Sequence, residues 1–184
     1  MSLPQLKEKF YTIDDIYALS DGERAELING QIYNMTPPSP KHQSIILKLA
    51  TIIDTYIESN DAPCKPFIAP YAVFLEEDIY TYVEPDISVI CDPDKLTDKG
   101  CNGAPDWIIE VVSPSSRQMD YYTKPLKYQT AGVREYWIID PMKSKITIHN
   151  FETEDISIYT FNETIKVGIF ENLLIDFKQL SLKF

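Results

Sequence analysis

The 184-residue sequence predicts an α/β fold, and three patterns carry that prediction. Apolar residues recur at helical spacing over residues 40–59, which indicates one long amphipathic helix. Residues 85–91 and 107–112 form nearly continuous apolar runs, typical of strands that are covered on both faces. Apolar and polar residues then alternate over 145–148 and 156–159, as in antiparallel strands that are solvated on one face. We therefore expect a central sheet flanked by helices, with an additional antiparallel C-terminal portion.

Capping and turn signals predict the remaining elements. A capping box at Thr12 predicts a short helix over residues 14–19. The pair Asn29-Gly30 predicts a tight hairpin within residues 25–36, with Glu26 on its first strand. Three further elements are expected: a strand over 67–75, a helix within 123–131 that ends at Gly132, and a strand over 135–139.

The whole chain, residues 1–184, is expected to form a single domain. It contains no internal repeat, no low-complexity tract and no Gly/Ser linker, and its 44% apolar content is sufficient for one core. No apolar run approaches the roughly 20 residues that span a bilayer. The N-terminal region lacks the basic start and apolar stretch of a signal peptide. We therefore expect a cytoplasmic protein with no membrane partner.

The three cysteines, Cys64, Cys91 and Cys101, are an odd number and lack the paired spacing of a metal site. No export signal argues for an oxidising compartment. The sequence therefore predicts three free thiols.

The balance of charge argues against generic binding to polyanions. The chain has 17 basic and 28 acidic residues and a net charge of −11, whereas nucleic-acid-binding proteins usually have a basic surface. A local basic groove is compatible with this balance, and a bound metal ion would neutralise carboxylates that are clustered at a site. The charge therefore lowers the expectation of a nuclease without excluding one.

Two carboxylates on expected neighbouring strands form a candidate metal site. Asp86 begins one expected strand and Glu110 lies toward the end of another, and adjacent strands are only about 4.8 Å apart. Asp106 is a competing candidate, but it is four residues from Glu110 on the same strand, roughly 13 Å away, and is expected to cap the entrance of that strand. Both site candidates also have a purely structural interpretation, as a turn residue and a salt-bridge residue.

Four segments, in order between about Tyr11 and Pro141, resemble the Uma2 family of restriction-endonuclease-like proteins, also called DUF820, in the PD-(D/E)xK nuclease superfamily. The resemblance implies a mixed central sheet flanked by helices. The segments are Glu26-Leu27-Ile28-Asn29-Gly30, Pro85-Asp86-Ile87-Ser88-Val89, Glu110-Val111-Val112-Ser113-Pro114-Ser115 and Gly132-Val133-Arg134-Glu135-Tyr136-Trp137.

The resemblance also implies roles for site residues. Asp86, Glu110 and the backbone carbonyl of Val111 would bind Mg²⁺, with Mn²⁺ as an alternative. Glu26 matches an upstream acidic residue of the family, which would bind a second metal or hold a metal-bound water. As an alternative, Glu26 is an exposed glutamate of the hairpin.

The sequence departs from the superfamily pattern at Val112, where the resemblance implies a lysine. Lys124 matches the place of a lysine on the following helix that would supply the missing charge. Pro125 fits a first helical turn, so Thr123 would cap this helix and Lys124 would lie at its start. Lys127, on the same helical face, is the second candidate.

Other polar residues receive weaker assignments. Arg117 and Asp120 would contact phosphate or pair with each other, and neither is expected to be catalytic. His42, near the start of the long helix, is expected to be a capping or packing residue, and His149 lies on a peripheral strand.

The favoured function is a Mg²⁺-dependent DNA endonuclease in which Lys124 assists the attacking water. In-line attack would leave a 5′-phosphate, as the resemblance implies, and cutting both strands would suit a homodimer with two sites. The sequence contains no Ser/His/Asp set, Walker-type phosphate loop or Cys/His metal cluster. The alternative is a non-catalytic interaction module that retains the nuclease fold, because the net charge is −11 and the motif lysine is absent.

Overall fold

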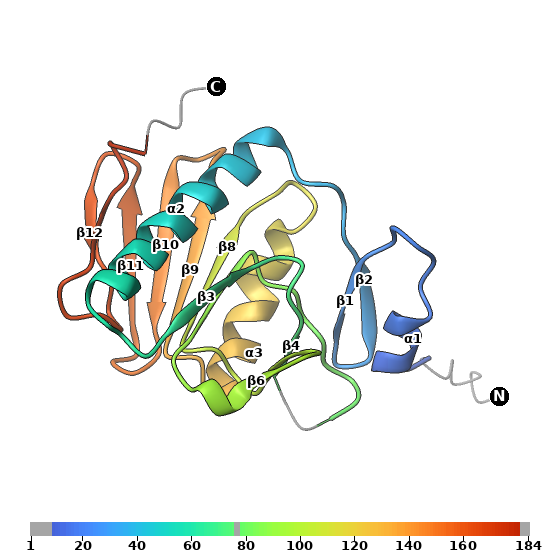
Figure 1. Ribbon diagram of the computed structural model, residues 1–184. Helices are drawn as coiled ribbons and strands as arrows, with labels where there is room; N and C mark the ends of the chain where they lie inside the picture. The colour runs from blue at the N-terminus through green and yellow to red at the C-terminus, as the bar shows by residue number, and fades with distance from the viewer. Residues whose placement is uncertain (1–8, 76–77, 181–184) are drawn as a thin grey trace.

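The computed structural model describes residues 9–75 and 78–180 and is built around a six-stranded mixed sheet (Figure 1). The strand order is β11-β10-β9-β8-β5-β3. Strands β8 and β9 are parallel, and every other neighbouring pair in this sheet is antiparallel. The strands are β3 (Lys65–Ile68), β5 (Ile87–Ile90), β8 (Trp107–Val111), β9 (Glu135–Asp140), β10 (Lys145–Asn150) and β11 (Asp155–Thr160).

The long helix α2 (Pro40–Ser59) covers one face of the sheet, with the bounds that its periodicity predicts. Ser39 caps the helix, because its side chain accepts a hydrogen bond from the backbone amide of His42, and Pro40 occupies a position that needs no amide donor. The apolar stripe of α2 packs against alternate residues of the central strands, among them Trp107 and Trp137. Five residues of α2 are buried: Ile45, Ile46, Leu49, Ile53 and Ile57.

The opposite face of the sheet is covered by α3 (Lys124–Ala131). Its Tyr128 packs with Ile108, Tyr136 and Ile138, which alternate along β8 and β9 with the residues that face α2. All residues of these two strands are buried. The continuous apolar runs in the sequence therefore reflect a sheet sandwiched between two layers of helix.

The N-terminal elements confirm the local predictions. The short helix α1 (Ile13–Tyr17) has the expected capping box. The hairpin pairs β1 (Ala25–Ile28) with β2 (Gln31–Asn34), and its two turn residues have positive φ angles of 51° and 75°. In Figure 1 this hairpin lies at the end of the molecule opposite β11.

The expected strand over residues 67–75 is divided between two sheets. Its second half is β4 (Val73–Phe74), which joins β6 (Leu96–Thr97) and β7 (Gly100–Asn102) in a small three-stranded sheet. Pro70 lies between the two halves and cannot donate a ladder hydrogen bond, so the strand does not continue through it.

The C-terminal part completes the core under α2. The antiparallel pairing of β10 and β11 is as expected, and β12 (Thr164–Lys166) pairs with β13 (Leu174–Asp176). The alternation predicts burial correctly for Ile146 and Ile148 of β10 but wrongly for β11, where Ile156 and Ile158 are 64% and 63% exposed. Ile165 and Ile175 of this second pair are buried in the same cluster as the stripe of α2. These strands therefore have a structural role.

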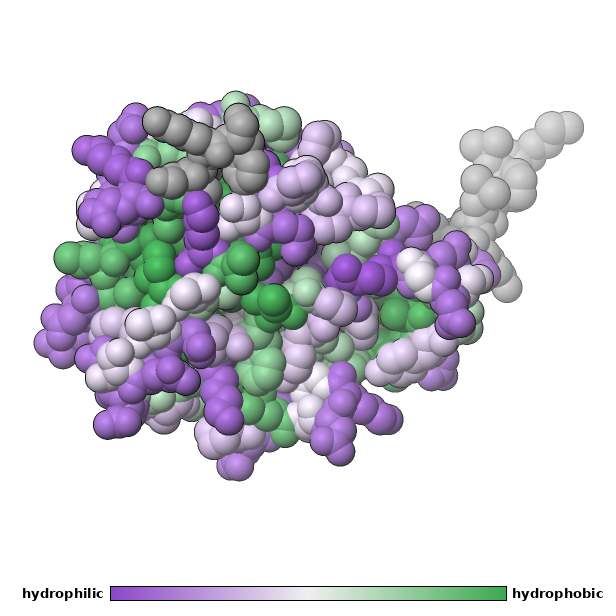
Figure 2. All heavy atoms as spheres, turned by 45° about the horizontal axis from the view of Figure 1, so that its top comes forward, coloured by the Kyte–Doolittle hydropathy of each residue, from purple (hydrophilic) through white to green (hydrophobic). Residues whose placement is uncertain are grey.

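The surface is mixed in polarity. On the face in Figure 2, hydrophilic side chains predominate and apolar patches lie between them. Among the described residues, no helix combines the length and apolar character needed to cross a membrane.

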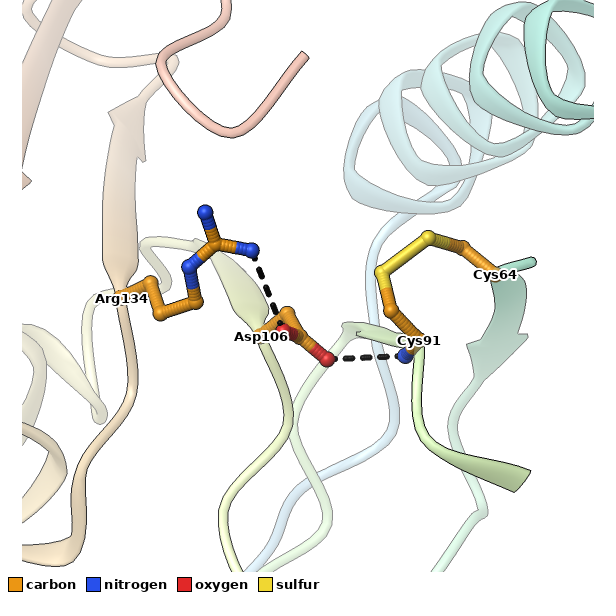
Figure 3. The surroundings of a disulfide bond; sticks show 4 residues. All are labelled: Cys64, Cys91, Asp106 and Arg134. Atoms are coloured by element: carbon orange, nitrogen blue, oxygen red, sulfur yellow. Dashed lines mark hydrogen bonds and ion pairs between the residues drawn. A yellow bond between two sulfur atoms is a disulfide. The ribbon is translucent and has the colours of Figure 1, made fainter. Parts of the chain in front are cut away.

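The prediction of three free thiols is wrong, because Cys64 and Cys91 form a disulfide (Figure 3). Lys65 pairs with Ile90 in the antiparallel ladder of β3 and β5, so the two cysteines lie side by side just beyond this pair. Their sequence separation of 27 gives no sign of this proximity. Cys101 is a buried free thiol.

Asp106 anchors the strand end beside the disulfide. One of its carboxylate oxygens accepts a hydrogen bond from the Cys91 amide at 2.8 Å, and the other lies 3.3 Å from the guanidinium of Arg134 (Figure 3). This position agrees with the expected capping role of Asp106 and separates it from the candidate metal site.

Reduction of the disulfide should lower the free energy of unfolding by about 2–4 kcal/mol, because it releases a closed loop in the unfolded chain. Guanidinium unfolding with and without dithiothreitol measures this difference, and Cys64→Ser should abolish the effect of reductant. In the native protein, Cys101 should stay unreactive toward thiol reagents, because burial raises its pKa to about 11. Equal free energies of unfolding with and without reductant would contradict the predicted effect of the disulfide.

Candidate active site

A cleft of about 1170 Å³ opens between the β1–β2 hairpin, the first turn of α2 and the segment that follows β8. Acidic side chains outnumber basic ones in its lining, so the cleft is not a basic groove. Five carboxylates, three cationic side chains and one histidine line it: Glu26, Glu84, Asp86, Glu110, Asp120, Arg24, Lys41, Lys124 and His42.

Asp86 and Glu110 lie side by side in the cleft, as their expected strand positions predict. Ile87 pairs with Ile109 in the antiparallel ladder. Asp86, which precedes Ile87, therefore lies beside Glu110, which follows Ile109. The Asp86 amide lies 3.4 Å from Glu110 Oε2, and the Val111 amide donates to Asp86 Oδ2 at 2.7 Å. Asp86 directly precedes β5 and is not part of its ladder, and the hydrogen bond from the Val111 amide holds its carboxylate.

Glu110 is a buried carboxylate with strong donors on one oxygen. Its Oε1 accepts hydrogen bonds from Lys124 Nζ at 2.8 Å and from the Tyr128 hydroxyl at 2.9 Å. Burial raises the pKa of Glu110 well above its usual value, the ammonium of Lys124 opposes this effect, and Asp86 is among the carboxylates that add to it. Folding therefore disfavours the charged form of Glu110, and the ammonium of Lys124 offsets only part of this effect.

Lys124 is the lysine that reaches the carboxylates. It is 4% exposed, and its Nζ lies 2.9 Å from Glu26 Oε2, 2.8 Å from Glu110 Oε1 and 3.7 Å from Asp120 Oδ1. Burial lowers the pKa of Lys124, but these carboxylates outweigh it and raise the pKa well above the usual value. Lys124 therefore carries its proton at neutral pH.

The helix around Lys124 differs from the prediction. A π-helical turn (Met119–Thr123) runs directly into α3, and the Lys124 amide donates to the carbonyl of Met119. Thr123 has a helical conformation and makes no capping hydrogen bond through its side chain, so its expected role as a cap is wrong. The π turn continues the helix up to Pro125, and π turns of this kind occur frequently at functional sites.

Lys127 binds elsewhere, because its Nζ donates to the side chain of Asn29 in the hairpin turn at 2.8 Å. Glu26 does belong to the cleft: it is 6% exposed and its Oε1 also accepts a hydrogen bond from the Glu84 amide. The alternative of an exposed hairpin glutamate is therefore wrong.

Arg117 and Asp120 do not pair with each other. The guanidinium of Arg117 binds Asp140 at 2.7 Å, whereas Asp120 accepts a hydrogen bond from the Ser116 hydroxyl at 2.6 Å and faces Lys124. The buried Asp120 thus joins the acidic cluster. His149 was expected on a peripheral strand but is on β10, which lies between β9 and β11 in the sheet, and its ring stacks on Tyr136.

His42 is a site residue whose position the sequence did not predict. Its Nε2 lies 3.2 Å from Asp86 Oδ2, and the two side chains are only 12% and 14% exposed. Burial lowers the pKa of His42, but contacts with Asp86 and the backbone of Val111 outweigh it, so the pKa is raised. Only the position near the start of a capped helix could have indicated this residue.

The donor set fits a hydrated hard cation. Among the described side chains, no group of three or more His, Cys, Asp or Glu is arranged to hold a metal ion. Mg²⁺ does not require such a group, since it commonly binds one or two carboxylates and keeps several waters. Protein donors occupy Asp86 Oδ2 and Glu110 Oε1, whereas Glu110 Oε2 accepts only the long 3.4 Å contact. Each carboxylate therefore keeps an oxygen with capacity for a cation.

Comparisons with known proteins agree with this fold. The Uma2 family model, described as "Putative restriction endonuclease", matches residues 8–177. "Uncharacterized protein slr1290" of Synechocystis sp. is 25% identical over 141 residues, which are 77% of this chain and 68% of that protein. A crystal structure from Anabaena variabilis, described as "a putative nuclease belonging to DUF820", has a TM-score of 0.75 at 21% identity and covers 92% of this chain and 96% of its own. The chain belongs to the Uma2 family.

Proposed function

We propose that the protein is a metal-dependent endodeoxyribonuclease that hydrolyses phosphodiester bonds. The observation that carries this proposal is the pair of carboxylates, Asp86 and Glu110, beside a buried lysine in an open cleft. Asp86, Glu110 and the carbonyl of Val111 would hold Mg²⁺ or Mn²⁺. The ion would activate water and stabilise the charge of the leaving oxygen.

Lys124 would act as a hydrogen-bond donor and not as a base, because its raised pKa keeps Nζ protonated. Its contact with Glu110 Oε1 would orient that carboxylate and leave Oε2 for the metal. Glu26, 2.9 Å from the same ammonium, would hold a metal-bound water or a second ion.

The surroundings of Val112 account for the missing motif lysine. Val112 is 3% exposed and packs with Tyr128 in the cluster under α3, where a lysine would bury an uncompensated charge. Lys124 brings an ammonium to Glu110 from the helix instead. Because Lys124 can supply the charge from another position in the chain, the absence of the motif lysine is weaker support for a non-catalytic module.

The acidic lining supports a metal requirement for binding DNA. A polyanion would be repelled by a cleft with five carboxylates until a divalent cation reduces their charge. DNA would therefore bind after the metal, and a homodimer would bring two sites to the two strands. Products would carry a 5′-phosphate.

Plasmid nicking with Mg²⁺, Mn²⁺ or EDTA, together with calorimetric titration of each metal, tests this proposal. We expect binding of a divalent metal and conversion of supercoiled to nicked DNA only when the metal is present. A wild-type protein that binds neither metal and nicks no DNA would refute the nuclease and favour the interaction module.

A further inference from the structure

His42 occupies a rigid place at the mouth of the cleft. It is the third residue of α2, its amide donates to the capping side chain of Ser39 at 3.2 Å, and the helix behind it is packed against the sheet along its apolar stripe. The imidazole is therefore positioned by the fold and not by a mobile loop.

The imidazole contacts two of the three groups proposed to bind metal. Its Nε2 lies 3.2 Å from Asp86 Oδ2, and the backbone of Val111 also contacts the ring. The Val111 amide donates to the same Oδ2 at 2.7 Å, so two donors converge on this oxygen. The other oxygen, Oδ1, has no hydrogen-bond partner among the described residues.

This arrangement does not suit a general base. Nδ1 of His42 is buried and has no hydrogen-bond partner within the described part of the chain, so it cannot reach a substrate water. Nε2 is engaged with Asp86, and it can donate a hydrogen bond in either charge state of the ring. The ring can therefore act on the reaction through the groups that it contacts, and Asp86 is the one with a side chain that the ring can orient.

We propose that His42 is a positioning residue that holds Asp86 Oδ2 and thereby directs Oδ1 toward the metal. The two carboxylates would then be held in the same way, each by two contacts to one oxygen. Lys124 and Tyr128 hold one oxygen of Glu110. His42 and the Val111 amide hold one oxygen of Asp86. This role rests on the proposed function, because it requires Asp86 to bind a metal. Groups that orient metal ligands typically change metal affinity by about 10–100-fold.

Two amide substitutions at His42 test this role. The side-chain nitrogen of glutamine can take the place of Nε2, whereas that of asparagine takes the place of Nδ1, which donates to no described group. We expect His42→Asn to weaken Mn²⁺ binding by about 10–100-fold and His42→Gln to stay within about threefold of wild type. Electron paramagnetic resonance measures the free Mn²⁺, and the bound fraction follows by difference.

The same variants separate positioning from folding. At saturating Mn²⁺ the nicking rate of His42→Asn should approach that of wild type, because the variant changes the affinity and not the reacting groups. If His42→Asn does not fold, His42→Ala replaces it in the comparison with His42→Gln. Equal affinities of all variants, or equal losses for glutamine and asparagine, would overturn the role of His42 while the nuclease proposal stands. A wild-type protein without metal binding would overturn both.

Discussion

Replacement of Lys124 by methionine should destabilise the protein by about 3–5 kcal/mol at pH 7 and abolish metal-dependent nicking. The ammonium lies within 3.7 Å of Glu26, Glu110 and Asp120, all of which are buried. Methionine fills a similar volume without charge, so the variant leaves three buried carboxylates that lack this cation. Removing one partner of a buried ion pair costs more than the pair itself contributes, because the remaining charge cannot be solvated.

The loss in Lys124→Met should depend on pH. Burial already raises the pKa of Glu110, and the variant removes the charge that opposes this effect. A carboxyl group with a raised pKa in the folded state costs no stability while it is protonated. Its cost begins as pH rises through the pKa of the unfolded chain and grows up to the pKa of the folded state. The difference between variant and wild type should therefore be small near pH 4 and large at pH 7.

Urea unfolding at pH 4, 5.5 and 7 measures this dependence. Lys127→Met is the matched control, since Lys127 is on the same helix and binds Asn29 at an exposed position. This control should change the free energy of unfolding by less than about 1 kcal/mol at each pH. A loss in Lys124→Met that is constant over the range would indicate a packing effect and contradict the electrostatic explanation.

Local sequence signals predicted most elements of the fold. The bounds of α2 follow from its apolar period, and the structure adds the cap at Ser39. The hairpin follows from Asn29-Gly30, whose backbone conformation few other pairs adopt readily. The break at Pro70 was missed because the apolar and β-branched residues on both sides of it resemble one continuous strand.

The site was only partly predictable, because its contacts join segments that are distant in sequence. Adjacent strands brought Asp86 and Glu110 together, as their positions predicted. The contact between Lys124 and Glu26 spans 98 residues, and the disulfide depends on the register of β3 and β5. No sequence pattern around His42 shows whether its side chain contacts Asp86 or caps the helix.

The isosteric variants Asp86→Asn and Glu110→Gln should each lower the metal-dependent nicking rate by about 10³-fold. Both changes remove a formal charge that the metal needs and retain the size and planarity of the side chain. An amide oxygen at position 86 can still accept the hydrogen bond from the Val111 amide. Asp106→Asn is the matched control, because Asp106 also follows a proline at a strand end but contacts Cys91 and Arg134.

Stability should change little in these variants, and this contrast with activity is the sharper test. The raised pKa of Glu110 means that folding favours its neutral form, so Glu110→Gln removes a charge that the folded state opposes. Lys124 keeps Glu26 and Asp120 as partners in that variant. The free energy of unfolding at pH 7 should stay within about 1 kcal/mol of wild type or increase, as is common where a site is selected for activity over stability. If Glu110→Gln instead lost several kcal/mol and retained nicking, the cluster would be a structural ion network and the nuclease site would lie elsewhere.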